Sequence, residues 1–139
     1  MQFVCNAPGG AAWFRIETEA EAEAESALMR HAVERYFHRY QEAARACYRP
    51  PKGAASFEEV IGLKDHVARV TPLFLTLRAS DGTGLATAML PPGGRKHSSF
   101  RTIVVGPKNG DPFATHSAAI NALGAHFGLT LNRDECYPY

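Results

Sequence analysis

Hydrophobic and polar positions alternate near the start of the chain in a pattern that fits two kinds of secondary structure. Residues 17–25 read ETEAEAEAE, so every second residue is a glutamate. On a strand these carboxylates would share one face and repel each other, and alanine and glutamate are both poor strand formers. On a helix the same carboxylates divide between two sides, and both residue types favour helices. The segment therefore predicts a helix.

The residues around this segment set the start and the length of the expected helix. Thr18 followed by Glu21 matches a capping box, in which a hydroxyl and a carboxylate bond to free backbone N–H groups of the first turn. Apolar side chains then recur at steps of three and four: Met29, Val33, Phe37, Tyr40, Ala44 and Cys47. We therefore expect one long helix over residues 19–47, with acidic residues first and arginines later, as the helix dipole favours.

The rest of the chain alternates between loops and regular segments. Residues 48–56, YRPPKGAAS, hold two prolines and a glycine and predict a linker or lid. Apolar spacing predicts a helix near residues 112–127 and another near residues 56–70, where Gly62 and the β-branched residues leave a strand as the alternative. Runs of β-branched and aromatic residues with turn signals between them predict strands. These strand segments are residues 2–6, 11–17, 72–78, 84–90 and 99–106.

This order of elements predicts the fold class and the number of domains. Helices and strands are mixed without the strict alternation of a parallel α/β fold, and short turns join neighbouring strands. We expect an α+β fold, an antiparallel sheet of about four to six strands with the three helices packed on it. At 139 residues the chain predicts a single domain, residues 1–139.

Composition restricts the function classes. Apolar residues make up 45% of the chain and charged residues 21%, with a net charge of +1, which is typical of a folded protein without a general affinity for polyanions. No run of about 18 apolar residues predicts a membrane span, and the first ten residues lack the pattern of a signal peptide. Three widely spaced cysteines predict reduced thiols. The expected location is the cytoplasm.

The sequence gives no motif for catalysis, for a cofactor or for a metal. Neither G-x-S-x-G nor a glycine-rich nucleotide motif is present, and no cysteine lies in a catalytic signature. His31, Glu34 and His38 lie close to one helix face, but two turns separate the histidines by about 10 Å, too far for one ion. We interpret these three residues as a row of surface ion pairs.

Charge is distributed unevenly, and this motivates two hypotheses. Residues 17–25 hold five glutamates and no basic residue, whereas residues 86–110 hold four basic residues and no acidic one. The first hypothesis is a non-catalytic interaction module that self-associates or binds another protein, using the opposite tracts for orientation. Its apolar contact would come from an aromatic helix face, made of Tyr36, Phe37 and Tyr40.

The second hypothesis is nucleic-acid binding through the basic loop 94–101 and the arginine-rich end of the long helix. Its candidate anion-binding residues are Arg95, Lys96, His97, Arg101, Arg35 and Arg39. The near-neutral net charge and the glutamate tract argue against it. A third alternative is a small enzyme whose site the sequence does not reveal, in a pocket beneath the segment 48–56. We favour the interaction module.

Overall fold

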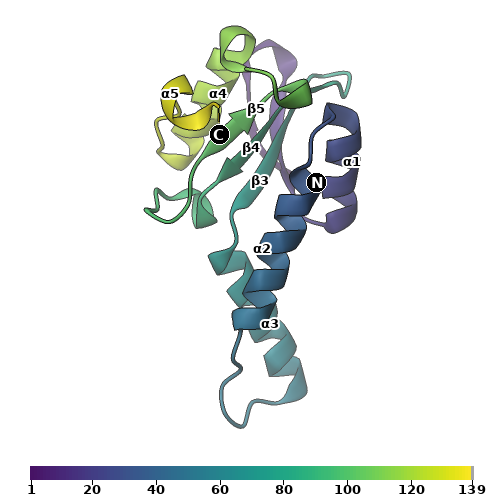
Figure 1. Cartoon of the computed structure of the whole chain (residues 1–139), viewed down its shortest axis with the longest axis vertical. Coiled ribbons are helices and arrows are strands. Elements are labelled where there is room, and N and C mark those ends of the chain that lie inside the picture. Colours follow the sequence, from purple (N-terminus) through teal and green to yellow (C-terminus); the bar gives the residue numbers. More distant parts are fainter. Residues whose placement is uncertain (139) are drawn as a thin grey trace.

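The structure, a computed structural model, describes residues 1–138. Its strands are β1 (Gln2–Asn6), β2 (Ala12–Ile16), β3 (Leu73–Arg78), β4 (Gly84–Leu90) and β5 (Ile103–Val105). Its helices are α1 (Glu19–Met29), α2 (Val33–Cys47), α3 (Ser56–Val70), α4 (Phe113–Phe127) and α5 (Arg133–Cys136). Short 3-10 turns lie at Pro8–Gly10, Pro92–Gly94 and Pro107–Asn109 (η1, η2 and η3). The predicted α+β class is confirmed (Figure 1).

The five strands form one antiparallel sheet in the order β1-β2-β3-β4-β5. Each strand therefore pairs with the strand that precedes it and the strand that follows it in the sequence. Turn residues bring these neighbours together. Between β3 and β4, the Thr83 N–H donates to the Asp81 carboxylate at 2.9 Å, and Gly82 has the left-handed φ of 89°. A glycine takes this conformation without the cost that a side chain would add.

One face of the sheet packs against α4 and holds the main core. Alternate residues of β3 and β4 point to this face, and Leu75, Leu77 and Leu90 are fully buried there. Trp13 of β2 joins them, and its indole Nε1 donates to the Ala119 carbonyl of α4 at 2.8 Å. The indole thus fills the core while its one polar group finds a partner. Figure 1 shows α4 and α5 on this side of the sheet.

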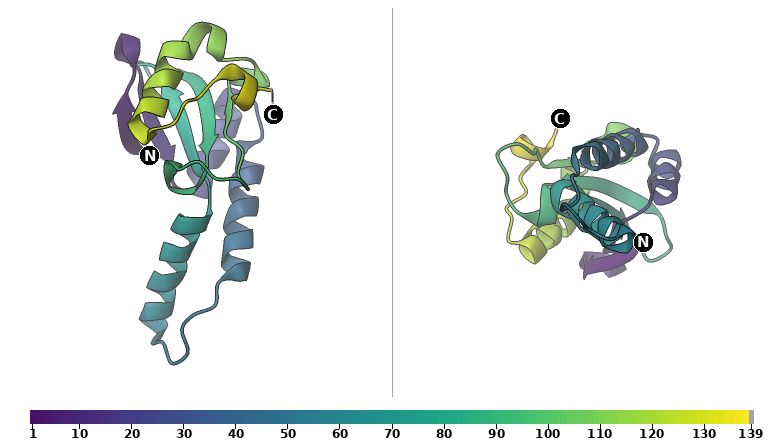
Figure 2. Two further views of the ribbon diagram at one scale, coloured as in Figure 1. Left: turned by 90° about the vertical axis from the view of Figure 1, so that its left-hand side faces the viewer. Right: turned by 90° about the horizontal axis from the view of Figure 1, so that it is seen from below.

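The opposite face packs against α1 and α2 and holds a smaller cluster. Its buried residues are Ile16, Ala22, Phe37 and Phe74. The rings of Phe37 and Phe74 meet edge to face, with centroids 5.3 Å apart. Seen from below, α1 and α2 lie on one side of the sheet and α4 on the other (Figure 2). The sheet is therefore the middle layer of three.

The single long helix expected over residues 19–47 is wrong, because the chain breaks between α1 and α2. The predicted capping box at its start is confirmed, since the Glu21 N–H donates to the Thr18 hydroxyl at 3.1 Å. Arg30 then adopts a left-handed φ of 56° and ends α1. The Ser26 hydroxyl accepts from the Glu34 N–H of the next helix at 3.1 Å, which supplies a partner to the first turn of α2. The break contains neither glycine nor proline. The bonds to Ser26 replace the backbone hydrogen bonds that a continuous helix would make there.

The helices α2 and α3 form a hairpin that projects beyond the sheet (Figure 2, left). The predicted helix at 56–70 is confirmed with the same bounds, and residues 48–55 lie at the tip of the hairpin, away from the sheet. Tyr48 stacks on His66 between the two helices, with ring centroids 5.3 Å apart. In the part of the chain that is described, no helix is long and apolar enough to cross a membrane.

Candidate functional site

A buried polar network lies between α1 and the sheet. Glu25 of α1 is fully buried, and its carboxylate accepts from the Arg78 guanidinium at 2.7 Å and from the Thr87 hydroxyl at 2.6 Å. Arg78 also donates to the Thr76 hydroxyl at 3.0 Å. The ring Nε2 of His31 lies 2.8 Å from the Thr87 oxygen. An arginine, a carboxylate, a hydroxyl and an imidazole are thus connected in a row beneath α1.

The hydrogen bonds of His31 define its tautomer. The Val33 N–H donates to Nδ1 at 3.4 Å, so Nδ1 is the acceptor and the proton lies on Nε2. The imidazole therefore donates to Thr87, whose hydroxyl donates to Glu25. Burial lowers the pKa of His31 below its ordinary value of 6.5, while the nearby carboxylates of Glu25 and Glu34 act in the opposite direction. The ring is neutral at physiological pH and both its nitrogens are occupied.

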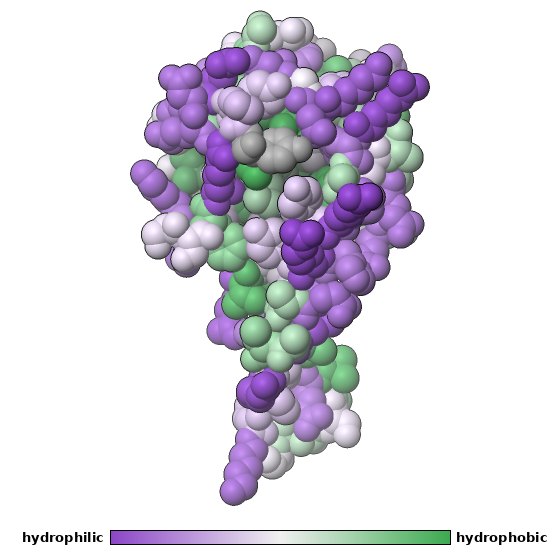
Figure 3. All heavy atoms as spheres, in the orientation of Figure 1, coloured by the Kyte–Doolittle hydropathy of each residue, from purple (hydrophilic) through white to green (hydrophobic). Residues whose placement is uncertain are grey.

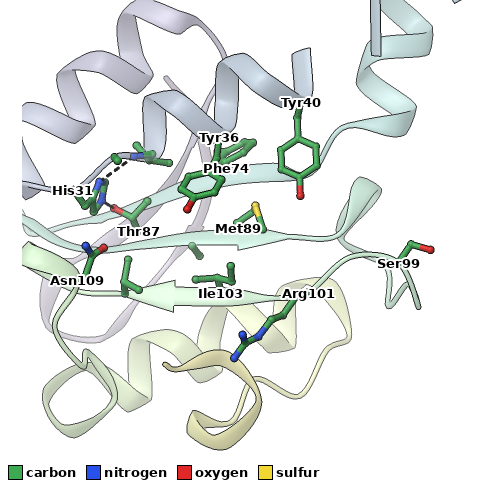
Figure 4. A pocket seen from close by; sticks show the side chains of 14 residues that line it. His31, Tyr36, Tyr40, Phe74, Thr87, Met89, Ser99, Arg101, Ile103 and Asn109 are labelled. Atoms are coloured by element: carbon green, nitrogen blue, oxygen red, sulfur yellow. Dashed lines mark hydrogen bonds between the residues drawn. The ribbon is translucent and has the colours of Figure 1, made fainter. Parts of the chain in front are cut away.

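A cavity of about 280 Å³ lies at the outer end of this network, between α2 and the strands β4 and β5. Its lining comes from the turn before α2, from α2 itself, from the two strands and from the segments on either side of β5. Figure 4 shows His31 and Thr87 at one end of the cavity and Ser99 at the other. Its lining includes His31, Tyr36, Tyr40, Phe74, Thr87, Met89, Arg101, Ile103, Val105 and Asn109.

The expected row of surface ion pairs is only partly correct. His38 is exposed and pairs with Glu19, with 2.7 Å between Nδ1 and the carboxylate, and this partner raises the pKa of His38. Glu34 bonds to the Ser26 hydroxyl instead. His31 is half-buried and bonds to a strand, because the break after α1 turns it toward the sheet. The prediction is therefore wrong for His31.

The basic loop contacts α2 through Phe100, whose ring centroid lies 5.9 Å from that of Tyr40. Arg95, Lys96 and His97 are exposed in the loop after η2, and the His97 ring packs against Phe100. The Arg101 guanidinium donates to the backbone carbonyls of residues 135 and 138, and it points toward α5 rather than into the cavity (Figure 4). The nucleic-acid hypothesis stays a prediction.

Arg35 and Arg39 are exposed on α2, and the Arg39 guanidinium lies over the Tyr36 ring, 5.5 Å from its centroid. The predicted aromatic face of Tyr36, Phe37 and Tyr40 is divided by the structure. Phe37 is only 4% exposed and belongs to the core, whereas the two tyrosines line the cavity. A continuous exposed patch of these three rings is therefore absent.

Most glutamates of the acidic tract, residues 17–25, form ion pairs with other groups of the same chain. Glu21 bonds to the N-terminal amine, Glu19 pairs with His38, and Glu25 pairs with Arg78. These carboxylates are therefore committed to the fold. They do not form the free acidic surface that the first hypothesis used to orient a partner.

Among the described helices, α3 carries most of the large apolar side chains that remain exposed. Phe57, Val60 and Ile61 are 66%, 67% and 56% exposed. Phe57 and Ile61 lie on the side of α3 opposite His66, which stacks on Tyr48, whereas Val60 borders the groove between α2 and α3 together with Leu63. No residue of α3 is buried. Figure 3 shows apolar side chains along the projecting hairpin.

The three cysteine thiols differ in burial. Burial raises the pKa of both the Cys5 and the Cys136 thiols, which disfavours the reactive thiolate. Cys47 is exposed at the end of α2. Among residues 1–138 no group of three or more His, Cys, Asp or Glu side chains is arranged to hold a metal ion.

Comparison with known proteins adds no function, since no protein family, no curated protein and no solved structure matches this chain. Sequence reasoning missed the network of Glu25, Thr87 and His31. A signal for it was present. Ala22, Glu25, Ser26 and Met29 follow the three- and four-residue steps of a buried helix face, so one glutamate of the tract occupies a core position.

Proposed function

We propose that this protein is a self-associating interaction module, and that its contact surface is the outer face of α3. The supporting observation is the exposure of Phe57 and Ile61 on the outer face of a helix that buries none of its residues. Helices in water gain most of their stability by packing an apolar face. An uncovered apolar face on a projecting helix of 15 residues therefore favours packing against another molecule.

The apolar residues give the contact its driving force. Fully burying a side chain of this kind is worth about 1.5–3 kcal/mol, and Phe57 and Ile61 begin half to two-thirds exposed, so each contributes on the order of 1 kcal/mol. Two copies double the number of buried side chains. A helix of 15 residues is roughly 22 Å long, which suits a modest interface whose affinity depends on protein concentration.

Charge favours a second copy of this chain as the partner, in an antiparallel arrangement. Glu58 and Arg69 lie eleven residues apart on α3, which is close to three full turns, so they share one flank of the apolar face. Around a two-fold axis, antiparallel α3 helices place Glu58 of one copy opposite Arg69 of the other, and this pair occurs twice. The two hairpins together then form a four-helix arrangement.

The test is the association state of variants that keep the monomer fold. Because Phe57 and Ile61 are exposed, replacing both by serine leaves the core intact. Leu28→Ser is the matched control, since Leu28 is 50% exposed but lies on α1. In sedimentation velocity over a concentration series, the wild type and the control should form dimers at high concentration, and the double variant should remain monomeric.

A wild type that stays monomeric throughout the series would overturn the proposal. A double variant that still dimerises like the control would also overturn it, because the contact would then lie elsewhere. Circular dichroism spectra of the variants establish that each is folded.

A further inference from the structure

The cavity beside α2 lies over a part of the sheet that the helices leave open. On this face α1 and α2 cover the strands as far as β4, and the cavity extends over β4 and β5. Met89, Ile103 and Val105 form its floor. A cavity of about 150 Å³ lined by apolar groups is large enough for benzene. This cavity, at about 280 Å³, is large enough for one aromatic ring or for two fused rings.

Aromatic side chains form the wall above this floor. Tyr36 and Tyr40 extend from α2 toward the strands, and Phe74 lies behind them (Figure 4). The Tyr40 and Phe74 rings are tilted against each other, with centroids 6.4 Å apart, which fixes this wall. Aromatic walls above an apolar floor favour a flat ligand, which gains from ring contacts as well as from burial.

The lining presents no free charge. It contains no aspartate or glutamate. Its two basic side chains are both engaged elsewhere: His31 is neutral with both nitrogens bonded, and the Arg101 guanidinium bonds to backbone carbonyls near α5. A carboxylate or phosphate would therefore lose its hydration without gaining an ionic partner, and so would an amine.

Several polar side chains in the lining have no hydrogen bond to the described residues, and the hydroxyls of Tyr40 and Ser99 are among them. Within residues 1–138, neither the side-chain amide of Asn109 nor the Tyr36 hydroxyl makes a hydrogen bond to the protein. Figure 4 shows Asn109 at the end of the cavity near Thr87 and His31. Its backbone is anchored, because the Tyr137 hydroxyl donates to the Asn109 carbonyl at 3.1 Å. Asn109 is exposed, and its side-chain amide can offer a donor and an acceptor from this anchored backbone.

We propose that this cavity binds a small uncharged aromatic molecule with one hydrogen-bonding group, such as a phenol or an indole. The ring lies over Met89 and Ile103 and beneath Tyr36, and the hydroxyl or ring N–H bonds to Asn109. This binding is separate from the proposed self-association, because α3 contributes no residue to the cavity.

Titration of the ¹⁵N-labelled full chain, followed by amide chemical shifts, tests the proposal with chosen probes. We expect p-cresol and indole to shift amides of β4, β5 and the start of α2. Benzoate and benzylamine, of similar size but charged, should bind at least about tenfold more weakly, since a buried unpaired charge costs well over one hydrogen bond. A charged probe that binds as well as p-cresol would overturn the proposal, as would the absence of shifts with every probe.

Two variants locate the ligand and its polar contact. Ile103→Phe fills the floor of the cavity and should abolish binding, whereas Val60→Ser on α3 should leave it unchanged. Asn109→Gly removes the amide and keeps the left-handed backbone, φ 59° at this residue. This variant should bind p-cresol about five- to tenfold more weakly than the wild type, which corresponds to the loss of one hydrogen bond.

Toluene lacks the hydroxyl, so its binding should be the same in Asn109→Gly and in the wild type. Unchanged p-cresol binding in Asn109→Gly would overturn the assigned contact. Unchanged binding in Ile103→Phe would overturn the site itself. Because Val60→Ser affects only α3, the failure of self-association and the failure of ligand binding are recognised separately.

Discussion

Replacing Arg78 by methionine should destabilise the protein more than replacing its partner Glu25 does. The two side chains pair at 2.7 Å, but their surroundings differ. The Glu25 side chain is fully buried, whereas that of Arg78 retains 18% exposure. In Arg78→Met, Glu25 stays in the interior with only the Thr87 hydroxyl as partner.

The magnitude follows from this asymmetry. Breaking a buried ion pair by removing one partner costs about 3–5 kcal/mol, because the remaining charge is uncompensated. We expect Arg78→Met to cost about 3 kcal/mol, at the lower end, since the pair is partly exposed. In Glu25→Met the guanidinium can extend to water along its flexible stem, so the cost should be about 1–2 kcal/mol.

The variant that carries both Glu25→Met and Arg78→Met separates the energy of the ion pair from the effect of its surroundings. With both charges gone, the Thr76 hydroxyl loses its donor and the Thr87 hydroxyl keeps only its bond from His31, so the double variant should be more stable than Arg78→Met alone. Urea unfolding followed by circular dichroism gives the free energies. An Arg78→Met cost below about 1 kcal/mol, or a double-variant cost equal to the sum of the single ones, would refute the reasoning.

Three further changes test other parts of the structure. His31 should contribute a loss of stability as the pH falls below about 6.5, because the unfolded chain then binds a proton there that the folded chain, with its lowered pKa, does not. His38, whose pKa is raised, contributes in the opposite direction, so the wild type is compared with His31→Asn: between about pH 7.5 and about pH 5.5 the urea midpoint of the wild type should move to lower urea relative to that of the variant. Gly94→Ala should cost about 2 kcal/mol or more, since its Cβ would overlap the Phe127 ring, whereas Gly9→Ala, with a similar positive φ but open space, should cost about 1 kcal/mol in the same assay. Trp13→Phe leaves a carbonyl of α4 without its donor and should cost about 1–2 kcal/mol by thermal unfolding, whereas an unchanged melting temperature would contradict the role of that bond.

The helices and strands could largely be predicted because their signals are local. The capping box at Thr18 and the apolar spacing of residues 56–70 and 112–127 depend on neighbouring residues alone. The break after Met29 could not, because it has neither glycine nor proline. Arg30 takes the left-handed conformation there, and the capping of both helix ends by Ser26 is visible only in three dimensions.

The candidate sites depend on distant parts of the chain, so the sequence predicted them less well. Glu25 and Thr87 are separated by 62 residues, and only the register of β4 against the sheet and α1 brings them together. The apolar face of α3 was visible as a pattern. A helical period shows which side is apolar, but it does not show whether the rest of the chain covers that side.

The most direct test of the proposed antiparallel dimer exchanges the charges that flank the apolar face of α3. Glu58→Arg alone and Arg69→Glu alone each place like charges opposite one another across the two-fold axis, whereas the double variant restores opposite charges. In sedimentation velocity at low ionic strength, we predict that each single variant weakens the dimer and that the double variant recovers wild-type association. If the double variant associates no better than the single variants, α3 does not pair in this antiparallel manner and the account is contradicted.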